Sequence, residues 1–219
     1  MHCRPSSQAA DKRLAKAAAV SRAAWSAYDE ASDRFFQTYE SLRFSSTHRS
    51  FLRFLPAPGA RCLDIGAGSG RDASALAARG YEVTAVEPSH GLRALAEAKH
   101  RKAKIRWIDD YLPNLDKVKA LRDTYDFILL SAVWMHIEPR DRPLSLQSMK
   151  QLLSIDGSIA LTLRIGAELP DRPMYPIDVC EFIAQSAAAG LEVIYQGRKS
   201  EDYLKRTEVR WIKIVLKHR

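Results

Sequence analysis

Three glycines at alternate positions, Gly66, Gly68 and Gly70, form the most distinctive chemical feature of the sequence. They lie in the segment LDIGAGSGRD, residues 63–72, between an apolar run and a stretch with helical periodicity. Glycine adopts positive φ angles freely and, lacking a side chain, lets a ligand approach the backbone. Such a loop between a strand and a helix is typical of sites for nucleotide-like ligands, although a glycine triplet can also be an ordinary turn.

The spacing after Gly66 distinguishes between two classes of ligand. A dinucleotide fingerprint places its last small residue five positions after the first glycine, where helix and strand pack closely. Here that position holds the bulky Arg71, and the third glycine comes one residue earlier. Asp64, two residues before Gly66, adds a carboxylate that could accept a hydrogen bond from an ammonium group. This pattern argues against NAD and favours a ligand with an amino-acid moiety.

Acidic residues follow where the next two predicted strands end. Glu87, twenty-one residues after Gly66, could accept hydrogen bonds from both hydroxyls of a ribose. Asp109 or Asp110, after the third predicted strand, could accept from the exocyclic amine of an adenine. An exposed acid at a strand end is the alternative at each position. The order of these acids along the chain is consistent with one adenosine-containing ligand.

The segment SAVWMH, residues 131–136, follows the fourth predicted strand and contains the candidate catalytic residue. We expect His136 to act as a general base, since imidazole titrates near neutral pH; a structural histidine is the alternative. Trp134 could stack on an aromatic acceptor or pack in the core. Arg164, at the end of the fifth predicted strand, could bind an anionic group of the substrate or lie on the surface.

These residues need a scaffold that brings strand ends together, and the hydrophobic pattern predicts one. The predicted strands are Arg61–Ile65, Glu82–Glu87, Ile105–Asp109, Phe127–Ser131, Ser158–Arg164, Leu191–Gln196 and Trp211–Lys217. The predicted helices are Asp11–Tyr28, Ala31–Leu42, Thr47–Phe54, Gly70–Arg79, Gly91–Lys99, Arg142–Leu153 and Asp178–Ala189.

This alternation predicts an α/β fold, a doubly wound and mostly parallel sheet with helices on both faces. The last two strands lack an intervening helix, which predicts an antiparallel pair at one end of the sheet. The sequence PAPG at residues 56–59 breaks the helical pattern. We therefore expect a helical N-terminal cap over residues 1–55 and one Rossmann-like domain over residues 56–219. Tyr28 and Tyr39 of this cap would close over the ligand or pack within the cap.

The composition is that of an ordinary globular protein. Hydrophobic residues make up 46% and charged residues 27% of the 219 positions, and no apolar run is long enough to span a membrane. Three scattered cysteines, Cys3, Cys62 and Cys180, suggest neither a disulfide framework nor a metal site. We expect a soluble, cytoplasmic protein that binds no metal. The segment Arg4–Trp25, rich in Ala, Lys and Arg, resembles a transit peptide and equally an exposed helix.

The formal net charge of +8 and the pI near 9.5 leave two interpretations of the surface. A nucleic-acid partner would explain the charge, and so would a generally basic surface. Basic residues are spread along the chain, with local concentrations at Lys99–Lys104 and Lys117–Arg122. No recognisable nucleic-acid-binding motif accompanies them, and the sequence leaves the oligomeric state open.

Taken in order, the motifs resemble those of the class I methyltransferase superfamily over residues 60–165, and more loosely beyond. The segment Asp64–Gly70 resembles the first motif of that family, Glu87 its ribose-binding acid and Asp109-Asp110 its adenine-side motif. The resemblance implies a seven-stranded sheet of order 3-2-1-4-5-7-6, its last strand antiparallel, with S-adenosyl-L-methionine across the carboxyl ends of the first strands. It implies the following cofactor-binding residues: Asp64, Gly66, Ala67, Gly68, Ser69, Gly70, Glu87, Pro88, Asp109, Asp110, Ser131 and Ala132.

The chain departs from the family pattern at two places. Asp156-Gly157 replaces a frequent Pro-Gly before the fifth strand, and the acidic pair lies unusually near Leu112-Pro113. Of the two acids, we favour Asp109 as the partner of the adenine.

The resemblance implies an S-adenosylmethionine-dependent methyltransferase whose second product is S-adenosyl-L-homocysteine. Because one short domain carries no added recognition module, we expect the acceptor to be a hydroxyl, carboxyl or amine of a small molecule. Trp134, Arg164 and Tyr39 would contact it. An RNA (tRNA) methyltransferase, supported by the basic charge alone, is the alternative. A cofactor-binding protein without catalysis and an NAD-dependent dehydrogenase are further alternatives, and Arg71 counts against the dehydrogenase.

Overall fold

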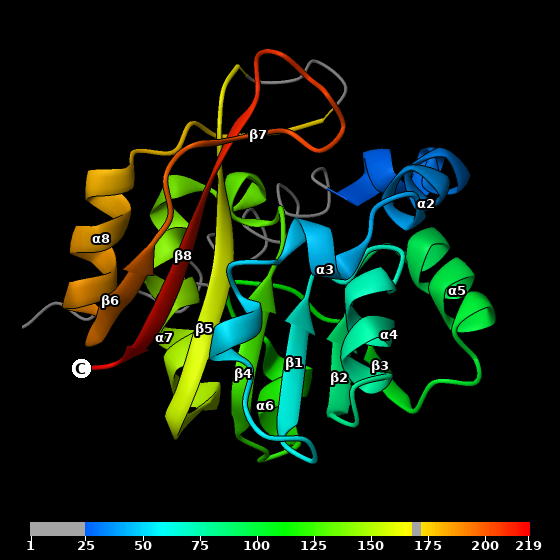
Figure 1. Cartoon of the computed structure of the whole chain (residues 1–219), viewed down its shortest axis with the longest axis horizontal. Coiled ribbons are helices and arrows are strands. Elements are labelled where there is room, and N and C mark those ends of the chain that lie inside the picture. The colour runs from blue at the N-terminus through cyan, green and yellow to red at the C-terminus, as the bar shows by residue number, and fades with distance from the viewer. Residues whose placement is uncertain (1–24, 168–171) are drawn as a thin grey trace, which may run out of the picture.

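The computed structural model describes residues 25–167 and 172–219, and an eight-stranded sheet forms its centre (Figure 1). The strand order is β3-β2-β1-β4-β5-β8-β6, and β7 pairs with β8. This order confirms the expected doubly wound sheet, in which β8 is the seventh long strand, and only the short β7 was not expected. The strands are β1 (Arg61–Ile65), β2 (Glu82–Val86), β3 (Ile105–Ile108), β4 (Tyr125–Leu130), β5 (Leu153–Ile165), β6 (Leu191–Gln196), β7 (Ser200–Glu201) and β8 (Arg210–His218).

The directions of the strands decide which loops meet. Strands β1 to β5 pair in parallel, so their carboxyl ends lie at one edge of the sheet. Strand β8 lies between β5 and β6 and is antiparallel to both, as the missing helix before it predicted. Figure 1 shows the N-terminal helices and the loop that contains β7 at this same edge. Segments from the beginning, middle and end of the chain therefore surround the carboxyl ends of the strands.

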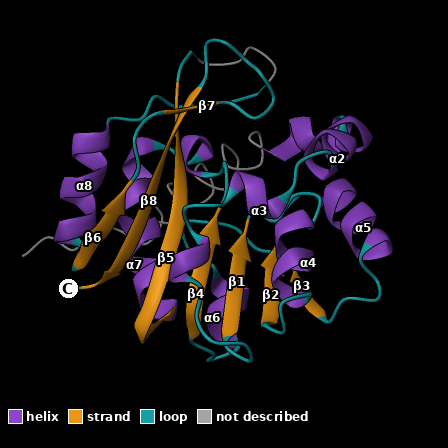
Figure 2. Ribbon diagram, viewed as in Figure 1, coloured by secondary structure: helices purple, strands orange, loops and turns teal. Residues whose placement is uncertain are grey.

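Helices cover both faces of the sheet (Figure 2). On one face, Phe44 and Leu76 pack on strand residues such as Phe127, and on the other, Met149 and Phe182 pack on a second apolar layer. Burial on both sides explains why the strands read as continuous apolar runs. The helices are α2 (Ser32–Glu40), α3 (Phe44–Thr47), α4 (Arg71–Ala77), α5 (His90–Lys99), α6 (Asp116–Ala120), α7 (Arg142–Leu152) and α8 (Val179–Ala188), with 3-10 turns η1 (Leu52–Phe54), η2 (Trp134–His136) and η3 (Pro139–Asp141).

The segment before the sheet packs beside α5. Residues 25–30 are helical, and Phe35 and Phe36 of α2 form a small apolar cluster with Leu92 and Ala96 of α5. The predicted helix Asp11–Tyr28 lies mostly outside the described residues. Within the described part of the chain, no helix is long and apolar enough to cross a membrane.

Two local predictions were wrong. The expected helix Thr47–Phe54 is instead the short α3 and the turn η1, because His48 and Phe51 between them are buried by tertiary contacts. The β5 strand begins at Leu153, five residues before the predicted start. Its register with β4 shifts beyond that point, so that residues 154–157, with Asp156-Gly157, form an irregularity inside a strand and not a turn before it.

Candidate active site

The loop from β1 to α4 is fixed against the end of β2 by backbone hydrogen bonds. The amides of Gly66 and Ala67 both donate to the carbonyl oxygen of Val86, at 2.8 and 2.9 Å. Gly66, Gly68 and Gly70 have φ angles of 71°, 57° and 77°, a region that side chains disfavour. The loop thus turns its backbone toward the carboxyl edge of the sheet.

The three glycines have different neighbours. A Cβ atom on Gly70 would lie 2.6 Å from the indole of Trp107, and one on Gly66 would overlap the side chain of Val133. At Gly68 the nearest atom would be 3.4 Å away, in the ring of Tyr39. Gly66 and Gly70 are therefore required for packing, whereas a Cβ on Gly68 would make only an ordinary van der Waals contact with the ring of Tyr39.

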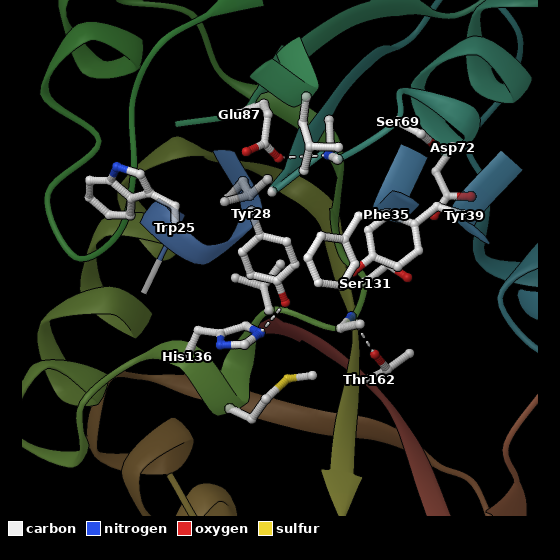
Figure 3. Close-up of a pocket in the computed structure, with 18 of the residues that line it drawn as sticks. Trp25, Tyr28, Phe35, Tyr39, Ser69, Asp72, Glu87, Ser131, His136 and Thr162 are labelled. Atoms are coloured by element: carbon white, nitrogen blue, oxygen red, sulfur yellow. Dashed lines mark hydrogen bonds between the residues drawn. The ribbon is translucent and has the colours of Figure 1, made fainter. Parts of the chain in front are cut away.

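Glu87 links this loop to the end of β2. Its Oε2 accepts a hydrogen bond from the amide of Gly68 at 2.7 Å (Figure 3). Its Oε1 accepts from the amide of Ser89 at 2.8 Å. The residue is only 5% exposed. Burial raises the pKa of the Glu87 carboxyl to about 7, and the two backbone hydrogen bonds oppose that rise.

A cleft of about 480 Å³ opens at this edge of the sheet. Figure 3 shows the rings of Tyr28, Phe35 and Tyr39 between Glu87 on one side and His136 on the other. The cleft is lined by these predicted site residues: Tyr28, Tyr39, Gly66, Ala67, Gly68, Ser69, Glu87, Pro88, Asp110, Ser131, Ala132 and His136. The structure therefore brings most of the predicted cofactor side and the predicted base to one space.

His136 is oriented by both of its ring nitrogens. Its Nδ1 lies 2.9 Å from the carbonyl oxygen of Pro173, and its Nε2 lies 2.9 Å from the hydroxyl of Tyr28. Because a carbonyl only accepts, Nδ1 must carry the proton, and Nε2 of the neutral ring then accepts from the Tyr28 hydroxyl. The nitrogen that could take a proton therefore points to the aromatic side of the cleft.

Hydrogen bonds join the segment after β4 to β5 and to the loop after β5, and they hold this histidine in place. The amide of Ala132, which has a φ of 59°, donates to Oγ1 of Thr162 at 2.8 Å. The amide of Tyr175 donates to the carbonyl of Met135 at 2.8 Å. Both contacts join residues that are far apart in the sequence, so the position of His136 depends on the tertiary structure.

The two acids of the adenine-side motif differ in position. Asp110 lines the cleft, and Asp109, which we favoured as the partner of the adenine, does not. Asp110 is buried and lines the cleft, and its carboxylate accepts hydrogen bonds from the amides of Tyr111, Lys117 and Val118 at the start of α6. The side chain of Asp109 is 53% exposed and lies 3.6 Å from Arg93. The amides of Lys117 and Val118 in α6 hold the Asp110 carboxylate, so Asp110 lines the cleft and Asp109 does not.

Two residues expected to contact the acceptor lie away from the cleft lining. Trp134 is 1% exposed and packs edge-on against Phe182 in the core. The 3-10 turn η2 explains this, because consecutive residues of such a turn point in directions about 120° apart. Arg164 is also buried, and its Nη1 donates to the carbonyls of Gly166 and Ala167.

Asp64, in β1, and Gly70, the last residue of the loop, also lie outside the cleft lining. Burial, and secondly the charge of Asp72, raise the pKa of Asp64 well above its usual range. Asp64 Oδ2 has no hydrogen-bond partner among the described residues. Asp72, in contrast, accepts from Arg71 at 2.7 Å and pairs with Nε2 of His48 at 2.8 Å. The sequence offered no motif for this buried cluster.

The C-terminal part of the cleft was missed entirely. Asp202, Arg206, Trp211 and Lys213 line the cleft, although no spacing relates them to the glycine loop. The pairing of β8 with β5 brings them there, since Trp211 lies opposite Arg164 in the antiparallel register. Among the described residues, no group of three or more His, Cys, Asp or Glu side chains is arranged to hold a metal ion.

Comparison with known proteins gives a family. The chain matches the model of a family described as methyltransferase domain over residues 27–176. It is 29% identical over 102 residues to an uncharacterized methyltransferase of Staphylococcus carnosus (strain TM300). That alignment covers 46% of this chain and 45% of the other, so the chain spans about half the length of this relative.

Solved structures share the fold. A TehB-like S-adenosylmethionine-dependent methyltransferase from Corynebacterium glutamicum has a TM-score of 0.64 at 18% identity, over 86% of this chain and 98% of its own. The glycopeptide N-methyltransferase MtfA, solved with S-adenosylmethionine, has a TM-score of 0.62 at 15% identity, over 81% and 95%. The magnesium protoporphyrin IX methyltransferase of Synechocystis PCC 6803 has a TM-score of 0.60 at 15% identity, over 86% and 79%.

The family match covers more than half of the chain and includes the glycine loop, Glu87 and His136. The strand order and the antiparallel β8 agree with it. The chain therefore belongs to the methyltransferase domain family, and its fold is that of S-adenosylmethionine-dependent methyltransferases.

Proposed function

We propose that this methyltransferase methylates a hydroxyl, carboxyl or amine of a small molecule. The main support is the enclosure of the cleft, in which Tyr28, Phe35 and Tyr39 line the space between Glu87 and His136 (Figure 3). A cleft of about 480 Å³ with such walls suits a small ligand better than an extended polymer. Two proteins of similar fold are named for a glycopeptide and for magnesium protoporphyrin IX.

The residues at the β1 and β2 end of the cleft fit S-adenosylmethionine. Each carboxylate oxygen of Glu87 accepts one backbone hydrogen bond and can accept another, so the pair could receive two ribose hydroxyls. Gly68 leaves room for the ligand, and Oδ1 of Asp110 accepts only from Tyr111. Glu87 would hold the ribose, Gly68 the amino-acid side and Asp110 the adenine. The walls of the site would be Ala67, Ser69, Pro88, Ser131 and Ala132.

Asp64 and Gly70 would act from outside the cleft lining. The unpartnered Oδ2 of Asp64 offers an acceptor for an ammonium group reached through a water molecule, and Gly70 lets the loop pack on Trp107. When bound, the donor supplies an electrophilic methyl group on a sulfonium. The chain's own residues would then position the acceptor in line with this group and exclude water from it.

His136 would take the proton of a hydroxyl acceptor at Nε2. In the structure this nitrogen accepts from the Tyr28 hydroxyl, so the acceptor's hydroxyl would take the place of that of Tyr28. The hydrogen bond from Nδ1 to Pro173 remains when the ring is protonated, because Nδ1 carries its proton in both states. The ring is thus oriented for proton transfer before the acceptor binds.

The test begins with calorimetric titration of the protein with S-adenosylhomocysteine and, separately, with NADH. We expect binding of the first and none of the second. The protein is then incubated with methyl-labelled donor and either a metabolite pool or a tRNA pool, and the labelled product is identified by mass spectrometry. Label in the tRNA fraction alone, with a steep salt dependence, would replace the small-molecule acceptor with RNA.

The proposal includes a cytoplasmic location, which the free thiol of the buried Cys62 supports.

A further inference from the structure

Charged side chains line both ends of the cleft, and some of them are paired, such as Arg71 with Asp72 and Arg206 with Asp202. Glu87 and Asp110 line the end formed by the first three strands, where the donor is proposed to bind. Arg206 and Lys213 line the end formed by β8 and the loop before it. The carboxylates Glu138 and Asp141 also line the cleft, but both lie within 3.9 Å of Arg140.

Lys213 is a cation whose partners in the described chain are neutral. It lies on β8 directly opposite Thr162 of β5, and both side chains line the cleft. Its Nζ donates to the backbone carbonyl of Thr47 and lies 5.6 Å from the ring centre of Tyr203. No carboxylate of the described residues forms an ion pair with it, and burial lowers the pKa of its ammonium group. Its charge is therefore uncompensated at short range.

The carboxylate beside the neighbouring arginines is already paired and does not balance the charge of Lys213. Arg206 forms a two-pronged pair with Asp202 at 2.7 and 2.9 Å, and Asp202 also accepts from the indole of Trp211. Arg164, directly opposite the cleft-lining Trp211 in the register of β5 and β8, has a buried Nε without a hydrogen-bond partner among the described residues. Burial, and then repulsion from Arg206 and Arg172, lower the pKa of Arg164. Arg164, Arg206 and Lys213 are three cations. Of the described carboxylates, Asp202 alone forms an ion pair with one of them.

Buried positive charge without a counter-ion costs free energy, and an anionic ligand would remove that cost. We propose that the acceptor carries an oxyanion, a carboxylate or a phosphate, that binds at the β8 end of the cleft against Lys213 and Arg206. This inference rests on the proposed methyl transfer to a small molecule and specifies its substrate class. The apolar part of the acceptor would lie beside Tyr28 and Tyr39, which line the same cleft.

The test compares benzoate with the neutral benzamide, which has nearly the same shape, and includes phenyl phosphate as a second kind of oxyanion. Protein saturated with S-adenosylhomocysteine is titrated calorimetrically with benzoate, with the neutral benzamide and with phenyl phosphate. We expect at least one anion to bind about tenfold or more tightly than benzamide, the effect of one charge-assisted hydrogen bond. Lys213→Met should abolish this difference and Lys213→Arg should retain it. Lys217→Met, on the same strand but outside the cleft lining, is the control.

Each outcome is decisive. If benzoate or phenyl phosphate shows the preference, the winning ligand identifies the oxyanion. Equal binding of the anions and benzamide, or no binding of any of them, would overturn the proposal. So would an anion preference that survives in the Lys213→Met protein. Binding of S-adenosylhomocysteine, measured first on every variant, shows separately whether the methyl-donor site is intact, so a failure of the donor site is not mistaken for a failure of the anion site.

Discussion

The buried carboxyl of Glu87 gives the donor site a pH dependence. Its pKa is about 7 in the structure, against an ordinary 4.5. If the ribose hydroxyls donate to the carboxylate, only the ionised protein binds the ligand well. About one molecule in eleven is ionised at pH 6 and about ten in eleven at pH 8, so the Kd for S-adenosylhomocysteine should rise about tenfold from pH 8 to pH 6.

Two variants isolate this effect in calorimetric titrations from pH 5 to pH 8. Glu87→Gln should bind S-adenosylhomocysteine weakly and with little pH dependence, because the amide places an NH₂ group against one of the two backbone donors. The loss at pH 8 should be about 1–3 kcal/mol, the cost of unsatisfied buried hydrogen-bond partners. Glu82→Gln, at the exposed start of the same strand, should behave as wild type. A wild-type Kd that is flat across this range would refute the reasoning.

Folding stability depends on pH in the opposite direction to ligand binding. A carboxyl whose pKa is raised by burial is easier to keep protonated in the folded state than in the unfolded chain. For Glu87 the rise from 4.5 to about 7 corresponds to about 3 kcal/mol of stability, present at low pH and lost as the pH rises through 7. Urea unfolding of the ligand-free protein should therefore show a smaller loss of stability between pH 5 and pH 8 in the Glu87→Gln variant than in wild type.

Three further substitutions test other parts of the site. His136→Ala should lower turnover of a hydroxyl acceptor by about 10²- to 10⁴-fold and leave the Kd for S-adenosylhomocysteine unchanged; unchanged turnover would remove its role as base. Gly68→Val should abolish donor binding, seen as loss of the thermal shift with S-adenosylhomocysteine, because the side chain would enter the ligand space beside Tyr39. Asp72→Asn should cost about 3–5 kcal/mol in urea unfolding at pH 7, since it leaves the buried His48 and Arg71 without their carboxylate; a loss below about 1 kcal/mol would show that the pairing contributes little.

The strands and the order of the sheet were predictable from sequence because burial on both faces produces continuous apolar runs. The bounds of β1 and β6 agree with the prediction residue by residue. The prediction of a helix over Thr47–Phe54 was wrong because burial in this segment does not follow a regular pattern. Its buried residues have separate tertiary partners, such as Asp72 for His48, and these contacts are not periodic along the chain.

Within a strand-end motif, the sequence did not decide which side chain faces the ligand. Asp109 and Asp110 are adjacent and chemically identical, and the amides of α6, a helix that was not predicted, determine which of them is drawn inward. Trp134 and His136 are separated by one residue, and the 3-10 turn sends one to the core and the other to the cleft. A shift of one residue in a loop is enough to exchange such roles.

The two ends of the cleft differ in how they are encoded. The donor end is built from contiguous loops, such as the turn from Gly66 to Gly70, whose backbone shape depends on the residues within it. The proposed acceptor end contains Tyr28, His136 and Lys213, which are far apart in the sequence and line one cleft only in the folded protein. Because these residues share no loop with Gly68 or Glu87, their substitution should alter which acceptor binds without altering the donor site. That separation explains why the sequence predicts the methyl donor and leaves the acceptor to be inferred from the charges of the folded cleft.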